Sequence, residues 1–159
     1  MEQVSTRYIT LGKQLDAILD KDLPYISNLA NFSALLWLEL SDINWVGCYL
    51  TNQNKDTLFL GPFQGKPACT SITVGKGVCG EAFAQQETLR VADVHSFPGH
   101  IACDSASESE IVVPFRLNGQ LFGVIDIDSP KLSRFGADDQ IGIEHLVNVL
   151  ENNLADVHF

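Results

Sequence analysis

The chain has 159 residues, of which 45% are hydrophobic, so it is long enough for one domain with a well-buried core and leaves little room for a second. Its 20 acidic residues outnumber its 10 Lys and Arg residues, which gives a net charge of -10. Nucleic acids and anionic membranes bind clustered cations, so this balance argues against both as partners. The sequence shows no apolar run of about 18 residues and no basic, apolar leader, and we therefore expect a cytoplasmic protein.

Apolar residues recur at helical spacing in two segments of the N-terminal region. They predict helices from about Tyr8 to Leu19 and from Tyr25 to Leu40. Aromatic and branched residues then dominate two short runs, Trp45–Leu50 and Thr57–Phe63, with a polar turn between them. This pattern predicts an antiparallel pair of strands.

The rest of the chain alternates between helical and extended patterns. A short helix is expected over Val78–Gln86 and a strand over Thr88–Val94. Two apolar runs flank Asn118-Gly119, a dipeptide preferred in tight turns, so Ile111–Asp128 is predicted to form a hairpin. A last helix should run from about Ala137 to Leu154.

Together these elements predict one α+β domain that spans residues 1–159. It would consist of N-terminal helices at about 8–40, a sheet and site region at about 45–128, and a C-terminal helix at about 137–154. The sheet is expected to be mostly antiparallel, with the N- and C-terminal helices packed on one of its faces. The opposite face is then the place for a functional site.

Two carboxylates near the end of the predicted hairpin are candidates for such a site. Strand alternation places Phe122, Val124, Asp126 and Asp128 on one face and the residues between them on the other. Carboxylates two residues apart lie roughly 7 Å from each other, and crowding in a poorly solvated pocket raises the pKa of at least one. The pair could therefore hold a proton near neutral pH, or it could simply be a solvated strand end.

The cysteines are candidates for thiol chemistry, because no Cys-x-x-Cys pair is present and a cytosolic disulfide framework is rare. Cys79 lies at the start of a predicted helix, where the dipole lowers the pKa of a thiol, so local physics makes it the most reactive. Acidic residues follow Cys103 and oppose its thiolate, although His95 and His100 could offset them if they lie close.

Two plainer interpretations of these residues remain. One is a zinc site, although the short paired ligand spacings of structural zinc sites are missing. Its ligands would come from Cys69, Cys79, Cys103, His95 and His100. The other is that the thiols are small buried apolar residues, which fits Cys48 best because it lies within a predicted strand.

Six motifs, in the same order, resemble those of the free methionine-R-sulfoxide reductases, a family with a GAF-type fold. They are WVG at 45–47, GKPAC at 65–69, GKGVCG at 75–80, HIACD at 100–104, SEIVVP at 109–114 and GVIDIDS at 123–129. Several long matches in register are far more specific than one short motif. Cys48 departs from the pattern, since a large apolar residue is expected there.

The resemblance implies a reaction and gives a role to each cysteine in the motifs. Cys103 matches the cysteine whose thiolate attacks free methionine-(R)-sulfoxide, which releases methionine and leaves a sulfenic acid. Cys69 matches the resolving cysteine, which forms a disulfide that thioredoxin then reduces. Cys79 matches a third family cysteine that could serve as an auxiliary resolving residue. The resemblance implies no bound cofactor and no metal.

The resemblance also implies a set of substrate-binding residues. Glu110, Asp126 and Asp128 match the carboxylates of the family pocket, one of which could stay protonated and donate to the sulfoxide oxygen. Trp45 and Tyr49 match aromatic residues that could pack against the substrate carbons. A homodimer, paired through an apolar helix face, is compatible with the fold.

The position of Glu110 conflicts with a regular hairpin. If Asn118-Gly119 closes a two-residue turn without irregularity, Asp126 lies opposite Ile111 and Glu110 points to the other face. Either Glu110 precedes the paired strand, or a bulge near Pro114 changes the phase.

Two other classes of function fit parts of the sequence. A GAF-type sensor would bind a small ligand and signal to an output domain, but it has no need of cysteines in these motifs. A thiol peroxidase or general redox sensor would use Cys103 without the acidic pocket.

Overall fold

A computed structural model describes residues 2–101 and 103–157 of the chain. The elements in these residues are α1 (Thr6–Ile18), α2 (Tyr25–Glu39), β1 (Trp45–Thr51), β2 (Thr57–Gly65), β3 (Ser71–Thr73), α3 (Gly77–Gln85), β4 (Leu89–Val91), the 3-10 helix η1 (Val94–Ser96), β5 (Ser109–Leu117), β6 (Gln120–Ser129) and α4 (Ala137–Asn152). The strands form one sheet in the order β3-β2-β1-β6-β5-β4, and every neighbouring pair is antiparallel.

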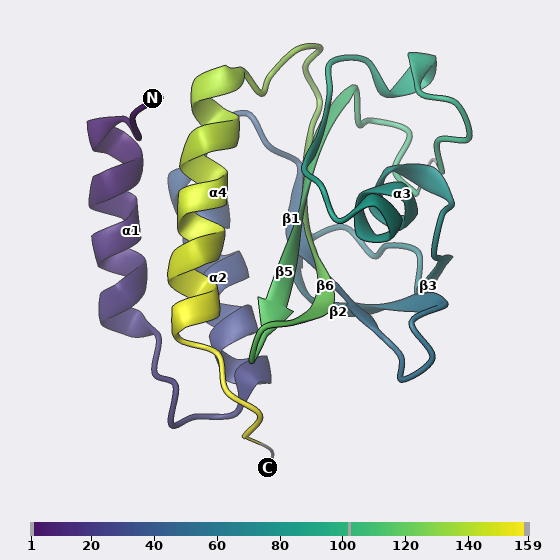
Figure 1. Cartoon of the computed structure of the whole chain (residues 1–159). Helices are drawn as coiled ribbons and strands as arrows, with labels where there is room; N and C mark the ends of the chain where they lie inside the picture. The colour runs from purple at the N-terminus through teal and green to yellow at the C-terminus, as the bar shows by residue number, and fades with distance from the viewer. Residues whose placement is uncertain (1, 102, 158–159) are drawn as a thin grey trace.

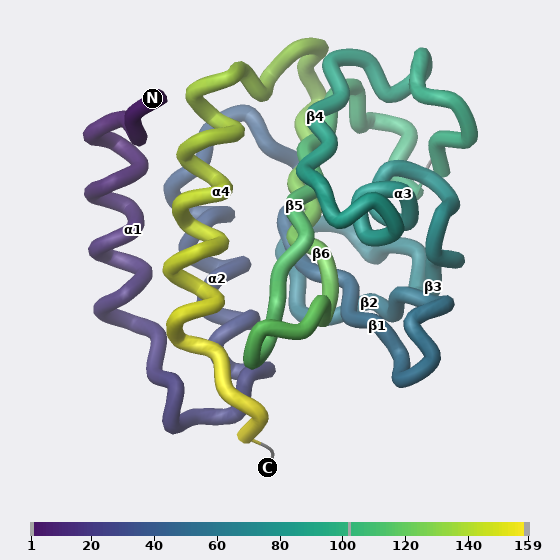
Figure 2. The backbone as a smooth tube through the Cα atoms, viewed as in Figure 1, coloured from purple at the N-terminus to yellow at the C-terminus, as the bar shows by residue number. Residues whose placement is uncertain are grey.

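The molecule is layered, with the sheet between two unequal groups of helices. Figure 1 shows α1, α2 and α4 on one side of the sheet and α3 on the other. The tube in Figure 2 shows the long connections around α3 and β4 gathered on that same second side. None of the helices in the described residues has the length and apolar character needed to cross a lipid bilayer.

Two hydrophobic clusters correspond to the two sides of the sheet. The larger cluster joins α1, α2 and α4 to the sheet and includes Phe32, Leu36, Ile125 and Leu146, each at most 1% exposed. The smaller cluster packs α3 against the other face. It includes Trp45, Tyr49, Val78, Phe83 and Val124. Burial of apolar surface is the main favourable term in folding. The larger cluster therefore contributes most to stability, and it supports the sheet on the face opposite the smaller cluster.

The predicted fold class and most predicted elements are confirmed. The expected strand Thr88–Val94 is shorter than predicted, because β4 ends at Val91 and Val94 starts η1. The side chain of Asp93 accepts a hydrogen bond from the backbone N–H of His95, which favours that turn over an extended strand. The three-residue strand β3 was not predicted, since so short a run carries no periodic signal.

A β-bulge changes the phase of the β5–β6 hairpin. Arg116 pairs with Leu121 but Phe115 pairs with Gly123, so Phe122 is an extra residue in β6. The expectation of a bulge near Pro114 is therefore confirmed. The expectation that Phe122 shares the face of Asp126 is wrong, because Phe122 packs with the helix-side cluster and Leu121 belongs to the other one.

A close contact between α1 and α4 depends on a glycine. Gly142 lies against the ring of Tyr8, which is 2% exposed, and a Cβ on this residue would overlap the ring. The Tyr8 hydroxyl donates a hydrogen bond of 2.6 Å to Asp139 in α4, so the ring has little freedom to move. Gly12, on the facing side of α1, would instead place its Cβ 2.8 Å from Nε2 of His145, the end of a flexible side chain.

We expect Gly142→Ala to lower the free energy of unfolding by about 1–3 kcal/mol, because an added methyl overpacks a rigid contact. Gly12→Ala is the matched control. It should change the free energy of unfolding by no more than about 1 kcal/mol, since His145 can move aside and alanine favours a helix. Urea unfolding followed by circular dichroism measures both, and equal effects would contradict the packing described for Tyr8.

Candidate active site

A pocket opens on the side of the sheet that carries α3. It holds about 570 Å³ of empty space, including its opening to solvent. Its walls come from β1, β5, β6, the start of α3 and the two connections that carry Cys69 and Cys103. The residues that line it are Trp45, Tyr49, Lys66, Pro67, Ala68, Ile72, Lys76, Gly77, Val78, Cys79, His100, Ile101, Cys103, Asp104, Ser107, Glu110, Asp126 and Asp128.

A disulfide between Cys69 and Cys103 joins two connections that are far apart in the sequence. The two residues are 34 positions apart, yet their Cα atoms lie 5.6 Å from each other. Cys103 lines the pocket and is exposed, whereas Cys69 is half-buried. The pairing gives two of the three motif cysteines a common place beside the pocket and leaves Cys79 as a free thiol.

The pocket aromatics hold the connection that carries Cys69. Trp45 Nε1 donates to the carbonyl of Lys66 at 3.2 Å, and the hydroxyl of Tyr49 donates to the carbonyl of Cys69 at 3.1 Å. The rings of Trp45 and Tyr49 stack with their centroids 5.9 Å apart. These two residues therefore combine an apolar pocket wall with polar anchors for the loop.

A second set of hydrogen bonds holds the connection that carries Cys103. The side-chain nitrogen of Asn44 lies 3.4 Å from Asp104 Oδ2 and 3.2 Å from Ser107 Oγ. The other oxygen of Asp104 accepts from the backbone N–H of Ala106 at 2.9 Å. Asn44 directly precedes β1, so the same strand that positions Cys69 also positions the segment around Cys103.

Three carboxyl groups meet at the floor of the pocket. Glu110 in β5 pairs directly with Asp128 in β6, while Asp126 pairs with Val112 two positions along. The bulge thus brings Glu110 to the same face as the two aspartates. Glu110 and Asp126 are each only 6% exposed. The crowding expected of Asp126 and Asp128 is confirmed, and the solvated strand end is excluded.

Burial changes the protonation of this acidic cluster, which consists of Glu110, Asp126 and Asp128. Burial raises the pKa of Glu110 well above its usual range, and the charges of the two aspartates raise it further. Burial also raises the pKa of Asp128 strongly, as does the charge of Asp126. The pKa of Asp126 is raised by burial and lowered by its hydrogen bonds to neighbours. Like charges this close cannot all ionise, so the cluster retains at least one proton near neutral pH.

One atom of the acidic cluster lacks a partner. Asp126 Oδ1 is buried, and no hydrogen bond reaches it from the residues that the structure describes. A buried carboxylate oxygen without a donor is costly, so a proton on a neighbouring acid or a donor group of a bound ligand must satisfy it. The pocket is therefore suited to a ligand with a cationic or N–H group.

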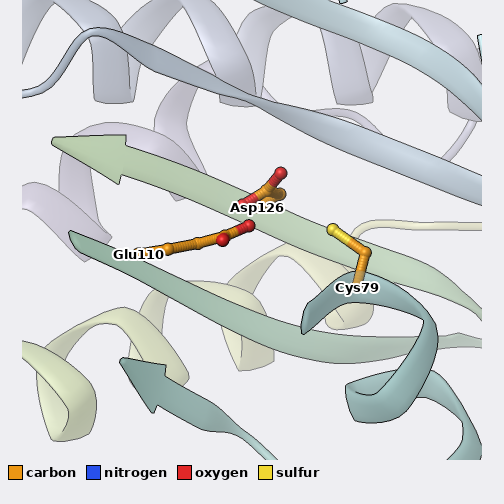
Figure 3. A group of neighbouring side chains, drawn as sticks. All are labelled: Cys79, Glu110 and Asp126. Atoms are coloured by element: carbon orange, nitrogen blue, oxygen red, sulfur yellow. The ribbon is translucent and has the colours of Figure 1, made fainter. Parts of the chain in front are cut away.

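The local physics of Cys79 does not produce the reactive thiolate predicted from its place in the helix. Cys79 lies in the first turn of α3, but it is 4% exposed and its sulfur points toward Glu110 and Asp126 (Figure 3). Burial raises its pKa well above the usual value, and the negative charges of Asp126, Glu110 and Asp128 raise it further. These effects outweigh the partial charge of the helix end. Burial also raises the pKa of Cys48.

Two groups of side chains in the described residues have the spacing of metal ligands. They are Cys79, Glu110 and Asp126, and Asp93, His95 and Glu108, with ligand atoms within 4.8 Å of one another in each group. Neither group is the zinc set considered from the sequence. Two members of that set, Cys69 and Cys103, form a disulfide and so cannot act as thiolate ligands in this structure. A metal ion at the first group would have to displace protons from groups whose pKa is raised, which weakens binding.

Two cationic pocket residues, Lys66 and Lys76, were not assigned a role from the sequence, and His100 was considered only as a residue that could favour the Cys103 thiolate or bind zinc. His100 lies beside the acidic cluster, and Lys66 and Lys76 line the pocket. All three occur within the motifs that carry the cysteines, which was the available signal. Their contact with the pocket could not be read from spacing, because the connections that hold them have no regular periodicity.

Comparison with known proteins places the chain in a class and then in a family. Residues 29–155 match the model of the GAF domain, so the chain belongs to the GAF-domain proteins. Within that class, it is 49% identical over 152 residues to the free methionine-R-sulfoxide reductase of Escherichia coli, covering 96% of this chain and 91% of that protein. The chain belongs to the free methionine-R-sulfoxide reductase family, and the resemblance noted in its motifs is confirmed.

Solved structures agree with this placement. The reduced form of fRMsr of Staphylococcus aureus is 47% identical, with a TM-score of 0.89 over 98% of this chain and 100% of that one. A free methionine-R-sulfoxide reductase from Neisseria meningitidis, solved in complex with its substrate, is 39% identical. Its TM-score is 0.87 over 96% of this chain and 92% of that one.

The acidic cluster should make stability depend on pH. A carboxyl whose pKa is raised by folding stabilises the protein below its unfolded pKa, and this contribution is lost as pH rises through the folded pKa. We therefore expect Glu110→Gln to gain stability relative to wild type as pH rises from about 4.3, the unfolded pKa of glutamate, by at most about 1.4 kcal/mol per pH unit. Urea unfolding at a series of pH values from about 4.3 to neutrality measures the difference in free energy of unfolding between Glu110→Gln and wild type. Glu87→Gln, at an exposed position, controls for the loss of a charge.

Proposed function

We propose that this chain reduces free methionine-(R)-sulfoxide to methionine, with Cys103 as the attacking residue and Cys69 as the resolving one. The observation that carries the proposal is the Cys69–Cys103 disulfide beside a pocket with three crowded carboxyl groups. A reductase of this kind needs both a redox-active thiol pair and a proton donor. The free methionine-R-sulfoxide reductase of Escherichia coli, which is 49% identical to this chain, supports the same reaction.

The proposed chemistry balances with the groups present. The Cys103 thiolate attacks the sulfoxide sulfur, and a protonated member of the acidic cluster gives its proton to the oxygen. The new bond between the two sulfur atoms and the bond between the substrate sulfur and oxygen then break as the protonated oxygen passes to Cys103. Cys103 is left as a sulfenic acid, and the substrate leaves as the thioether of methionine. Cys103 is oxidised by two electrons as the sulfoxide is reduced. The Cys69 thiol then displaces water from the sulfenic acid and forms the disulfide.

The pocket offers distinct surfaces for the parts of a free amino acid. Ionised members of the acidic cluster, including Asp126 with its unpartnered oxygen, would accept hydrogen bonds from the substrate ammonium group. The stacked rings of Trp45 and Tyr49 would pack against the methyl group and side-chain carbons. Glu110, Asp126 and Asp128 thus act both in binding and as the source of the proton.

External thiols would complete the cycle. Cys103 is exposed, so a reductant could reach the disulfide, and we propose thioredoxin in a cytoplasmic setting, without a bound cofactor. Cys79, buried beside the acidic cluster, would be at most an auxiliary resolving residue. We also propose that residues 1–159 act as one GAF domain. A homodimer stays a prediction of the sequence.

We expect the wild type to release methionine from the R form of free methionine sulfoxide and not from the S form, with thioredoxin recycling. Cys103→Ser should lose this turnover by at least about 1,000-fold, because the nucleophile is gone. Amino-acid analysis of the separated isomers measures both. If a folded, reduced wild type turned over neither isomer, a ligand-binding sensor would become the better interpretation, whereas activity in the variant would point to Cys79.

Cys69→Ser should still release one methionine per chain, because the first step needs only Cys103, but recycling by thioredoxin should fail. The sulfenic acid on Cys103 should then be trapped by dimedone and located by mass spectrometry. Cys79→Ser is the matched control, and it should retain at least about half of the steady-state rate, since the raised pKa of Cys79 keeps it a thiol. If Cys79→Ser were instead the variant that releases one methionine and then stops, Cys79 and not Cys69 would be the resolving cysteine.

A further inference from the structure

His100 lines the pocket beside Glu110 and is partly exposed to solvent. Its side chain is 15% exposed, while that of Glu110 is 8% exposed, and His100 Nε2 lies 3.8 Å from Glu110 Oε2. The distance is too long for a settled hydrogen bond but needs only a small side-chain shift to become one. His100 is thus the more exposed member of a pair whose other member is a buried acid.

A second histidine extends this contact toward the surface. His95 Nε2 lies 3.1 Å from Glu108 Oε2, and the side chain of His95 is 61% exposed. The charge of His95 acts on His100, lowering its pKa in addition to the larger lowering by burial. His95 is thus within electrostatic reach of His100, and its partner Glu108 is only partly exposed, with a side-chain exposure of 35%. The lowered pKa keeps His100 neutral, so that one ring nitrogen carries a proton to donate while the other can accept one.

The proposed reaction consumes a stored proton in every cycle. When a member of the acidic cluster protonates the sulfoxide oxygen, it becomes a carboxylate in a site where burial and neighbouring charges disfavour ionisation. A proton must return before the next attack. Glu110 is hydrogen-bonded to Asp126 and Asp128, so a proton that arrives at Glu110 can pass to either aspartate.

We propose that His100 is the proton-transfer residue that reloads the acidic cluster through Glu110, and that His95 supplies it from the surface. This inference rests on the proposed reductase function and adds a residue to it. His100 takes a proton from solvent or from His95 at one ring nitrogen and gives one to Glu110 from Nε2. No electrons move in this step, and the imidazole ends neutral.

The surroundings of His100 favour this direction of transfer. The titratable and charged side chains around His100 come from several parts of the fold. Glu110 lies beside it, His95 acts on its charge and contacts Glu108, and Asp104, Asp126, Asp128, Lys66 and Lys76 line the same pocket. Acidic groups predominate among them, so a transient imidazolium is stabilised once the cluster has lost its proton. When the cluster is protonated again, that stabilisation disappears and His100 returns to neutral.

The test separates the first turnover from later ones. In His100→Gln, reduced enzyme should release the first equivalent of methionine at close to the wild-type rate, because the stored proton is present. The steady-state kcat at saturating thioredoxin should fall by about tenfold or more, and added imidazole should restore part of it. His145→Gln, in α4 on the far side of the sheet, is the matched control and should keep wild-type kinetics.

Two further readouts exclude a merely structural role. The pH profile of Cys103 alkylation, followed at that residue by mass spectrometry, should be unchanged in His100→Gln. In NMR titrations, which need no activity, the His100 ring should titrate at a different pH in Glu110→Gln than in wild type. An unshifted His100 titration, an unchanged steady-state rate, or a loss confined to the first turnover would overturn the proposal. A wild type without reductase activity but with coupled titrations would instead contradict the proposed function alone.

Discussion

The ladder between β5 and β6 decides which side chains reach the pocket and which reach the helix-side core. One extra residue, Phe122, changes the phase of β6 between Leu121 and Gly123. Without it, Glu110 would point away from Asp126, and the apolar residues of β6 would face the wrong cluster. Because the side-chain period of a strand is two residues, a single inserted residue reverses every position beyond it. The acidic cluster is thus a consequence of backbone register.

The acidic cluster is energetically unfavourable, and the fold has to hold it in place. Carboxyl groups that are removed from water keep protons at a pH where they would normally ionise. Their burial and mutual repulsion lower the stability of the folded state. The large apolar cluster on the other face, with Ile125 and Ile127 alternating with the two aspartates along β6, supplies the compensating burial. The same strand therefore contributes to stability on one side and to chemistry on the other.

The redox cysteines depend on hydrogen bonds from β1 and the residue before it rather than on regular structure of their own. Tyr49 holds the carbonyl of Cys69, and Asn44 holds Asp104 beside Cys103. Connections without a ladder of their own generally open at a lower free energy than the strands of a sheet. This division gives a rigid acid floor beneath thiols that can exchange partners.

The sequence by itself determined the α+β class, the helices, the hairpin and, through the motifs around Cys69 and Cys103, the family, because these follow from local periodicity and long residue matches. It also indicated that Glu110 could join the two aspartates only if it preceded the paired strand or if a bulge changed the phase of the hairpin. Only the tertiary structure decided that Cys79 is buried against carboxyl groups, which reverses the pKa change expected from its helix end. It alone placed His100 beside Glu110. Burial and contact between distant segments set these properties, and neither is encoded in the spacing of residues along the chain.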